Sequence, residues 1–282
     1  MTTYMFPGQG SQVKGMGSDL FPHFPEQVKS ADNILGYSIA RLCTEDADNQ
    51  LNITSFTQPA LYVVNALTYL KIMADNKKAP DYAIGHSLGE YNALFAAGVF
   101  DFETGLKLVK KRGELMARAT GGGMAAVVGL SSETILTVLE KNNLTMLTIA
   151  NYNTLTQSVI SGPVDAIRSA EKPFIDAGAL LYMPLKVSGA FHSSYMNEAQ
   201  NEFKSFLTNV TFSQPKIQVI ANINAGPYKV EDVASNLTAQ INHSVMWTQT
   251  IKYLLDKGET LFTEIGPGKV LTGLLTKIQK GQ

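Results

Sequence analysis

Short apolar runs alternate along the chain with longer segments in which apolar residues recur at helical spacing. The runs 4–6 and 82–85 end at Pro-Gly and at glycine, so each predicts a short buried strand followed by a turn. Apolar residues recur every three or four positions through 58–73, which predicts a helix. Helices are also predicted at 88–99 and 102–116. This alternation indicates a mostly parallel sheet covered by helices.

The pattern changes after the glycine triplet 121–123, which is typical of a linker. Strands and helices then follow in the order β-α-β-β-α-β, the arrangement of the ferredoxin-like motif. The strands are predicted at 124–130, 147–151, 158–161 and 180–187, and the helices at 132–142 and 165–177. Because Ser-Gly at 188–189 marks the end of this segment, we predict a small inserted subdomain at 122–187.

The main domain resumes after the insert and is therefore predicted to comprise 1–121 and 188–282. Its later helices are predicted at 194–207, 230–241, 247–257 and 270–278, and its later strands at 217–221 and 261–265. The expected fold class is α/β, with a parallel sheet in the core and an inserted ferredoxin-like (βαββαβ) subdomain.

Composition narrows the possible functions. The 282 residues include 23 Lys and Arg against 24 Asp and Glu, which argues against a nucleic-acid binder and a polybasic membrane-surface protein. The start of the chain does not resemble a signal peptide, and no apolar run approaches the roughly 18 residues of a membrane helix. Cys43 is the only cysteine, which excludes an internal disulfide and a thiolate metal cluster. We therefore expect a cytoplasmic protein.

The segment Gly85-His-Ser-Leu-Gly89 lies between a predicted strand and a predicted helix. In this setting a Gly-x-Ser-x-Gly pattern places the serine hydroxyl on a tight turn. The N-terminus of the following helix supplies N–H groups that stabilise a developing oxyanion. We therefore interpret Ser87 as a nucleophile for acyl transfer, the alternative being a purely structural turn.

A serine nucleophile needs a base, and the chain has four histidines. His86 adjoins the serine and should point elsewhere, while His23 lies among prolines in a predicted surface turn. His192 lies where the insert returns to the main domain, and such junctions line clefts. We predict His192 as the base, with His243 as the second choice and a satisfied core histidine as the structural alternative.

No carboxylate stands out as the third member of a catalytic triad. Asp101, Asp165 and Asp176 fall between the serine and His192, but the last two lie in the insert. A backbone or amide carbonyl could orient the imidazole instead, giving a Ser-His dyad that we hypothesise suits transfer better than rapid hydrolysis. No histidine or carboxylate cluster has the spacing of metal ligands, so we expect neither a metal nor a cofactor.

Two further segments carry candidate polar groups. Phe6-Pro-Gly-Gln-Gly-Ser-Gln12 is a glycine-rich turn without the signature of a phosphate loop, and Gln9 or Gln12 could donate to an oxyanion. Residues 107–112 read Lys-Leu-Val-Lys-Lys-Arg on a predicted helix, which is ordinarily a solvated basic face. One arginine of such a helix could instead turn inward and bind a carboxylate through two nitrogens.

A series of motifs is ordered along nearly the whole chain: Phe6-Pro-Gly-Gln-Gly-Ser-Gln12, Thr57-Gln-Pro-Ala60, Gly85-His-Ser-Leu-Gly-Glu90, Lys111-Arg-Gly113, Gly189-Ala-Phe-His192, Trp247 and Glu264-Ile-Gly-Pro-Gly-Lys-Val-Leu-Thr-Gly273. Through these motifs the chain resembles the malonyl-CoA:acyl-carrier-protein transacylases, and most of all the discrete trans-acting acyltransferases of polyketide synthases. The resemblance implies an α/β-hydrolase-like core with the ferredoxin-like insert. The chain departs from the family at His243-Ser-Val-Met-Trp247, where fatty-acid enzymes usually have Asn-Pro-Val-x-Trp.

The resemblance implies roles for individual residues. Ser87 matches the nucleophile and His192 matches its base. Gln240 matches the residue whose backbone carbonyl orients the histidine, which would answer the missing acid. Gln9 and the Leu88 N–H match the oxyanion hole.

Selectivity and partner binding are implied in the same way. Arg112 matches the arginine that holds the malonyl carboxylate, and a sister group of acyl hydrolases lacks this arginine. Phe191 matches the bulky residue associated with selection of malonyl over methylmalonyl. Because the carrier proteins of this family are acidic, the basic strip Lys107, Lys110 and Lys111 is a candidate docking face.

The expected activity is that of a malonyl-CoA:ACP S-malonyltransferase with a ping-pong mechanism. It moves malonyl from malonyl-CoA to the phosphopantetheine thiol of an acyl carrier protein through a seryl-malonyl intermediate, in trans for a polyketide synthase. The alternatives are a fatty-acid-synthesis malonyl transacylase, an acyl hydrolase that clears stalled carrier proteins, and a non-catalytic carrier-binding module. We expect a monomer that binds neither nucleic acid nor membrane.

Overall fold

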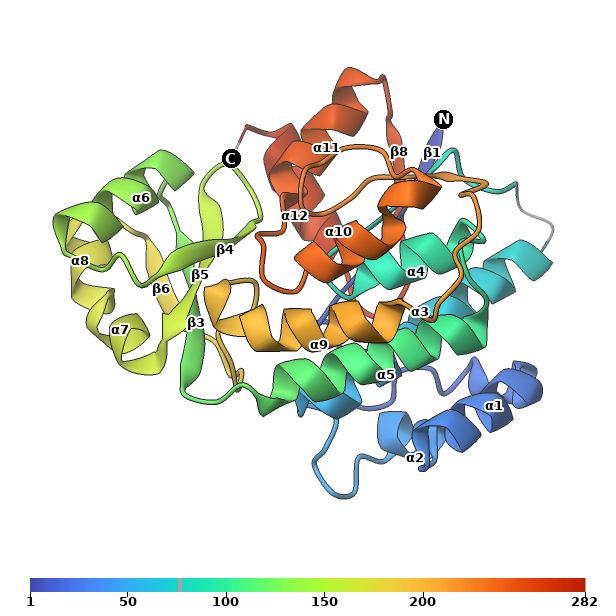
Figure 1. Ribbon diagram of the computed structural model, residues 1–282. Coiled ribbons are helices and arrows are strands. Elements are labelled where there is room, and N and C mark those ends of the chain that lie inside the picture. Colours follow the sequence, from blue (N-terminus) through green and yellow to red (C-terminus); the bar gives the residue numbers. More distant parts are fainter. Residues whose placement is uncertain (76–77, 282) are drawn as a thin grey trace.

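The strands of residues 1–75 and 78–281, which the computed structural model describes, form two sheets (Figure 1). The first sheet is parallel, with the strand order β7-β2-β1-β8. The second sheet is antiparallel, with the strand order β4-β5-β3-β6. These two sheets confirm the predicted fold class, in which a parallel sheet in the core is accompanied by a separate, smaller antiparallel sheet.

Helices cover both faces of the parallel sheet. Its strands are β1 (Thr2–Phe6), β2 (Tyr82–Gly85), β7 (Gln218–Val219) and β8 (Leu261–Glu264). The helices of this part are α1 (Pro25–Leu35), α2 (Ile39–Thr44), α3 (Thr54–Ala74), α4 (Gly89–Ala96), α5 (Phe102–Arg118), α9 (Asn197–Leu207), α10 (Val233–Ala239), α11 (Trp247–Asp256) and α12 (Val270–Gln279), with 3-10 turns η1 (Phe21–His23), η2 (Ser194–Met196) and η3 (Val230–Asp232). Met5 and Ile84 pack with α11 and α12, while Tyr4 and Phe6 pack with α3 and α4. Burial on both faces explains the continuous apolar run in β1.

The antiparallel sheet is built within residues 122–184. Its elements are β3 (Gly122–Val128), α6 (Ser132–Lys141), β4 (Thr148–Tyr152), β5 (Gln157–Pro163), α7 (Val164–Ser169), α8 (Glu171–Asp176) and β6 (Leu181–Pro184). Ile160 and Phe174 belong to a core that this sheet shares only with its own helices. Met124 and Val159 belong instead to the core of the main domain, so the opposite face of the sheet rests on that domain.

The structure differs from the predicted elements in both parts of the chain, and the predicted strand 217–221 is confined to Gln218–Val219. The predicted helix 165–177 is two short helices that meet at Ala170. The reason is Pro173, which has no N–H and whose ring would collide with the carbonyl four residues earlier in a continuous helix. The predicted strand 180–187 is confined to Leu181–Pro184. Helices α1 and α2 were not predicted.

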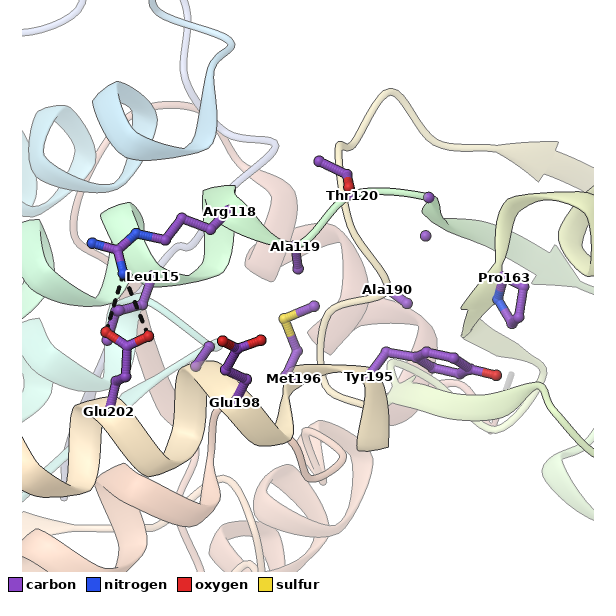
Figure 2. A pocket seen from close by; sticks show the side chains of 13 residues that line it. Leu115, Arg118, Ala119, Thr120, Pro163, Ala190, Tyr195, Met196, Glu198 and Glu202 are labelled. Carbon is purple, nitrogen blue, oxygen red and sulfur yellow. Dashed lines mark hydrogen bonds and ion pairs between the residues drawn. The ribbon is translucent and has the colours of Figure 1, made fainter.

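The edge of the small sheet is hydrogen-bonded to the main domain. Val245 lies in the loop before α11; its N–H donates to Ala150 O at 2.8 Å, and its carbonyl accepts from the Tyr152 N–H at 3.0 Å. The chain crosses between the two parts at Ala119–Gly122 and again before Ala190, beside the cavity drawn in Figure 2. Because β4 is fixed in this way, Asn151 of this strand lines the same cavity as Ser87, and Asn153 lies within hydrogen-bond distance of His86, which follows β2.

Candidate active site

Ser87 occupies a strained turn between β2 and α4. Its φ is +52°, in the left-handed region that non-glycine residues rarely adopt. A Cβ on Gly85 would collide with the backbone of Gly89, and a Cβ on Gly89 would collide with the Phe6 carbonyl. The two glycines therefore allow strand, turn and helix to approach closely enough to project the serine hydroxyl from the sheet edge.

His192 is hydrogen-bonded to the serine hydroxyl. Ser87 Oγ and His192 Nε2 are 2.8 Å apart. His192 Nδ1 lies 2.8 Å from Gln240 O and 3.1 Å from His243 O. Since carbonyl oxygens only accept, Nδ1 carries the proton and Nε2 is left to accept one from the serine. The missing acid of the sequence prediction is thus replaced by two backbone carbonyls.

The surroundings of His192 keep its imidazole neutral. Burial lowers the pKa of His192 to about 3, and the positive charge of Arg112 acts in the same direction. The bonds to the carbonyls of Gln240 and His243 oppose this shift without reversing it. A neutral imidazole with its Nε2 lone pair aimed at Ser87 has the protonation state that a general base requires.

Arg112 is a buried cation that contacts only neutral groups. It extends from α5 with 1% of its surface exposed. Nη1 donates to Gln58 Oε1 at 2.7 Å, and Nη2 donates to Gln240 Oε1 at 2.8 Å and to Ser87 Oγ at 3.0 Å. The guanidinium lies over the Tyr91 ring at 5.6 Å. Within the described residues none of the ion pairs includes Arg112, so the charge is placed to receive an anion beside the nucleophile.

The two candidate oxyanion glutamines lie in different places. Gln9 lines the same cavity as Ser87, and its Nε2 donates to Thr54 Oγ1 at 3.3 Å. Gln12 is turned away, because its side chain binds the Gly10 N–H and the Asn52 amide. The structure therefore favours Gln9 over Gln12 as the side-chain donor.

The backbone donor beside the nucleophile is the Leu88 amide. Among the described residues, no acceptor is hydrogen-bonded to this N–H. Leu88 immediately precedes α4, so its amide belongs to the N-terminal end of a helix, where N–H groups are available to an anion.

These groups surround a small cavity of about 100 Å³. Its polar end is formed by Ser87, His192 and Arg112, and its walls are mostly apolar. The remaining lining residues are Gln9, Gln58, His86, Leu88, Met116, Met124, Asn151, Leu185, Val187 and Phe191. The Phe191 ring is buried and precedes the base directly. The residues of the insert on this list place the small sheet over the nucleophile.

A larger cavity of about 560 Å³ opens at the crossing between the two parts (Figure 2). It shares none of its lining residues with the smaller cavity, although Leu115 and Met116 are neighbours on α5. Its arginine, Arg118, is already paired with Glu202 at 3.0 Å. In the part of the chain that the structure describes, no serine or histidine lines the larger cavity, so it lacks a nucleophile and base of the kind found around Ser87.

The other predicted residues have structural positions. His86 is half-buried, with its Nε2 at 2.9 Å from Asn153 Oδ1, and His243 contributes its carbonyl rather than its exposed imidazole. In the basic strip, Lys107 is exposed and Lys111 is half-buried. Lys110 Nζ donates to the Ile34 carbonyl at 2.8 Å, at the end of α1. The Lys110 ammonium is thus engaged within the fold, which weakens its assignment to a docking face.

Sequence reasoning missed three residues that touch the site. Gln58 binds Arg112, Asn222 Oδ1 accepts the Ser87 N–H at 2.7 Å, and Glu90 accepts from the Gln240 side chain at 2.6 Å. Gln58 and Glu90 lie within motifs that were recognised, but without an assigned role. Asn222 had no local signal, because it is 135 residues away from Ser87 along the chain.

Residues 1–75 and 78–281 contain neither a metal cluster nor a membrane-spanning helix. No three or more His, Cys, Asp or Glu side chains are grouped so that they could hold an ion. None of the helices combines the length and the apolar character needed to cross a bilayer. Cys43 is buried, and burial raises its pKa to about 12, which leaves its thiol unreactive.

The similarity to known proteins extends over nearly the whole chain. A family model described as an acyl transferase domain matches residues 3–280. The polyketide biosynthesis malonyl CoA-acyl carrier protein transacylase PksC of Bacillus subtilis (strain 168) is 56% identical over 281 residues, which cover 99% of this chain and 98% of that protein.

Solved structures agree in fold. The crystal structure of malonyl CoA-acyl carrier protein transacylase from Burkholderia pseudomallei has a TM-score of 0.97 and 49% identity, covering 100% of this chain and 99% of that one. A malonyl-transacylase in complex with AntF, a type II PKS acyl-carrier protein, has a TM-score of 0.94 and 34% identity, covering 99% and 93% of the two chains.

Proposed function

The chain belongs to the acyl transferase domain family, and from this premise we propose that it moves malonyl from malonyl-CoA to an acyl carrier protein. The activity is that of a malonyl-CoA:acyl carrier protein transacylase. The observation that carries this function is the position of Arg112, a buried cation with only neutral partners, whose Nη2 lies 3.0 Å from Ser87 Oγ. An acyl group on Ser87 that ends in a carboxylate would place its charge against this guanidinium.

The first half of the reaction loads the enzyme. Ser87 Oγ attacks the thioester carbonyl of malonyl-CoA while His192 Nε2 takes the hydroxyl proton. The Leu88 N–H and the Gln9 amide donate to the oxyanion of the tetrahedral intermediate. As the intermediate collapses, the C–S bond breaks, His192 returns its proton to the CoA sulfur, and malonyl remains as an ester of Ser87.

The second half reverses these steps with a different thiol. His192 takes the proton of the phosphopantetheine thiol, and the sulfur attacks the seryl ester. The same donors hold the oxyanion, the C–O bond to Ser87 breaks, and His192 protonates the released serine oxygen. The chain supplies nucleophile, base and oxyanion donors itself, so we propose a transfer without metal or cofactor. The phosphopantetheine arrives on the partner.

We assign the partner to polyketide biosynthesis, with the chain acting in trans. This assignment is supported by PksC, whose name includes polyketide biosynthesis and with which the chain is 56% identical. The structure of a related malonyl-transacylase with AntF supports a direct carrier complex. We further propose that the protein is a monomer and works in the cytoplasm. Light scattering during gel filtration measures the molar mass and so tests the monomer.

The malonyl adduct itself is the test of this function. Intact mass spectrometry of the protein mixed with malonyl-CoA is expected to detect one malonyl group per chain, which leaves when holo carrier protein is added. No adduct at the shortest mixing times would contradict the proposal. An adduct that disappears in buffer as quickly as with carrier protein would favour the acyl hydrolase.

Phe191→Ala is expected to relax selection against a branched substrate. The buried ring narrows the cavity next to the base, where the α-carbon of the acyl group would lie. The ratio of kcat/KM for methylmalonyl-CoA to that for malonyl-CoA should rise by about tenfold or more, the usual value of one methyl group in a tight pocket. Met124→Ala, which shortens another apolar side chain of this cavity, is the matched control. An unchanged ratio for Phe191→Ala would remove this residue from substrate selection.

Lys107 and Lys111 remain candidates for docking an acidic carrier protein. Reversing both charges (Lys107→Glu with Lys111→Glu) is expected to raise the apparent KM for the carrier several-fold, which corresponds to about 1 kcal/mol of binding free energy. Self-malonylation is expected to be unchanged. The difference should shrink at high salt because surface charges are screened. Lys141→Glu, on the exposed face of α6, is the control. Equal KM values for the reversed and wild-type proteins would exclude this face.

A further inference from the structure

Glu90 is a buried carboxylate that the transfer mechanism above does not use. It lies in the first turn of α4, three residues after the nucleophile, with 1% of its surface exposed. Its Oε1 accepts from the Asn222 N–H at 2.9 Å and from the Tyr228 hydroxyl at 2.8 Å, and its Oε2 accepts from Gln240 Nε2 at 2.6 Å. We propose that Glu90 is the positioning residue of this site, acting on Ser87, His192 and Arg112 through Asn222 and Gln240.

The first connection runs through Asn222. Its backbone N–H is held by Glu90, and its side-chain Oδ1 accepts the Ser87 N–H at 2.7 Å. Its Nδ2 donates to Gly85 O at 2.6 Å, two residues before the nucleophile. Asn222 therefore clamps the entry of the turn, and Glu90 fixes where Asn222 stands.

The second connection runs through Gln240. Its Nε2 donates both to Glu90 Oε2 and to Ser87 O, the latter at 2.7 Å. Its Oε1 is thereby left to face Arg112 Nη2 at 2.8 Å. Its backbone carbonyl accepts from His192 Nδ1. Gln240 thus orients both the base and the cation. Because Glu90 accepts from its Nε2, the side-chain oxygen of Gln240 is directed toward Arg112.

The strain of the nucleophile turn explains why such a device is needed. With φ at +52°, Ser87 keeps its conformation only if its surroundings hold it there. Both its N–H and its carbonyl are bonded to side chains that are tied to Glu90. A strained turn held from both sides by one carboxylate has little freedom to relax.

The charge of Glu90 also suits the substrate. Its carboxylate favours the buried cation of Arg112, but the Gln240 amide stands between them. A direct ion pair would occupy the guanidinium face that the malonyl carboxylate needs. Burial raises the pKa of Glu90 to about 7, and the three donors and the charge of Arg112 offset only part of this rise.

An isosteric change separates positioning from packing. Glu90→Gln keeps the shape but puts an NH2 group where a carboxylate oxygen stood, facing either the Gln240 Nε2 donor or the Asn222 N–H and Tyr228 hydroxyl. In the first case Gln240 must turn its amide over. Its oxygen would then face the Ser87 carbonyl and its NH2 would face Arg112, so that like groups oppose each other on both sides.

This inference rests on the proposed function, and the experiment keeps the two apart. Wild-type loading with malonyl-CoA tests the function. For Glu90→Gln we compare kcat/KM for malonyl-CoA with kcat/KM for acetyl-CoA, which has no carboxylate for Arg112 to hold. The ratio does not depend on the folded fraction, so a loss of stability alone leaves it unchanged. We expect the ratio to fall by about 10- to 100-fold, as misplacement of a binding group predicts.

Tyr228→Phe is the matched control. It removes one hydrogen bond from the same carboxylate but breaks neither connection to Ser87, so its ratio is expected to stay within about twofold of the wild type. If Glu90→Gln is insoluble, Glu90→Asp keeps the charge and shortens the reach, and the same fall is expected. A wild-type ratio in either soluble Glu90 variant, with active wild-type enzyme, overturns the inference.

Discussion

Ser87→Ala is expected to take up no malonyl group and to lose transfer activity by a factor on the order of 10⁴ or more. The hydroxyl is the group that lies 2.8 Å from His192 Nε2 and on the strained turn, and no other side chain of the cavity offers a hydroxyl. Intact mass spectrometry after mixing with malonyl-CoA gives the adduct, and transfer to holo carrier protein gives the rate.

Ser193→Ala is the control for this variant. Ser193 is buried next to the base, but its Oγ donates to Ala190 O at 2.6 Å and is not part of the cavity. The Ser193 variant is expected to retain a malonyl adduct. A full adduct on Ser87→Ala would show that the covalent chemistry belongs to another residue, and the dyad mechanism would be wrong.

Arg112→Ala is expected to change the preferred substrate. Removing a buried cation that pairs with a carboxylate costs about 3–4 kcal/mol of transition-state binding, or about 10²- to 10³-fold in kcat/KM for malonyl-CoA. Acetyl-CoA offers no carboxylate and should lose far less, so the ratio of the two specificity constants moves toward acetyl. Steady-state kinetics with both thioesters gives this ratio.

Arg118→Ala is the matched control on the same helix. Arg118 lies at the end of α5 and pairs with Glu202 in the larger cavity (Figure 2). Its loss should leave the malonyl-to-acetyl ratio unchanged. Thermal unfolding of both variants separates substrate effects from stability, because Arg112 also bonds Gln58 and Gln240. An unchanged ratio for Arg112→Ala would remove the guanidinium from carboxylate recognition.

The strand, turn and helix around Ser87 could be predicted because their causes are local. A short apolar run, two glycines and a following helical pattern suffice, and the structure has β2, a left-handed Ser87 and α4 in that order. The same holds for the alternation of elements in the insert. Helix α1 was missed although Pro25 stands at its first position and Gly36 ends it in the left-handed region.

The residues that hold the site could not be predicted in the same way. The site depends on contacts between segments that are far apart in sequence. His192 binds the Gln240 carbonyl, the Ser87 N–H binds Asn222, and Arg112 of α5 binds the Ser87 hydroxyl. Local pattern cannot say that Lys110 reaches the end of α1 while Arg112 turns toward the nucleophile. Both lie on one helix, and only the elements packed around that helix decide which cation is buried.

By itself the sequence determined the fold class, the serine on its tight turn and a set of candidate partners, because glycine geometry and apolar spacing act over a few residues. Only the tertiary structure decided which partners meet. Residue patterns alone left Gln9 and Gln12 open as donors, and the structure puts Gln9 in the cavity and turns Gln12 away. It also adds the His243 carbonyl to the Gln240 carbonyl as a second acceptor for His192. It also joined Glu90 to Ser87 through Asn222 and Gln240. These choices depend on directional contacts between distant segments, which exist only once both parts of the chain are packed together.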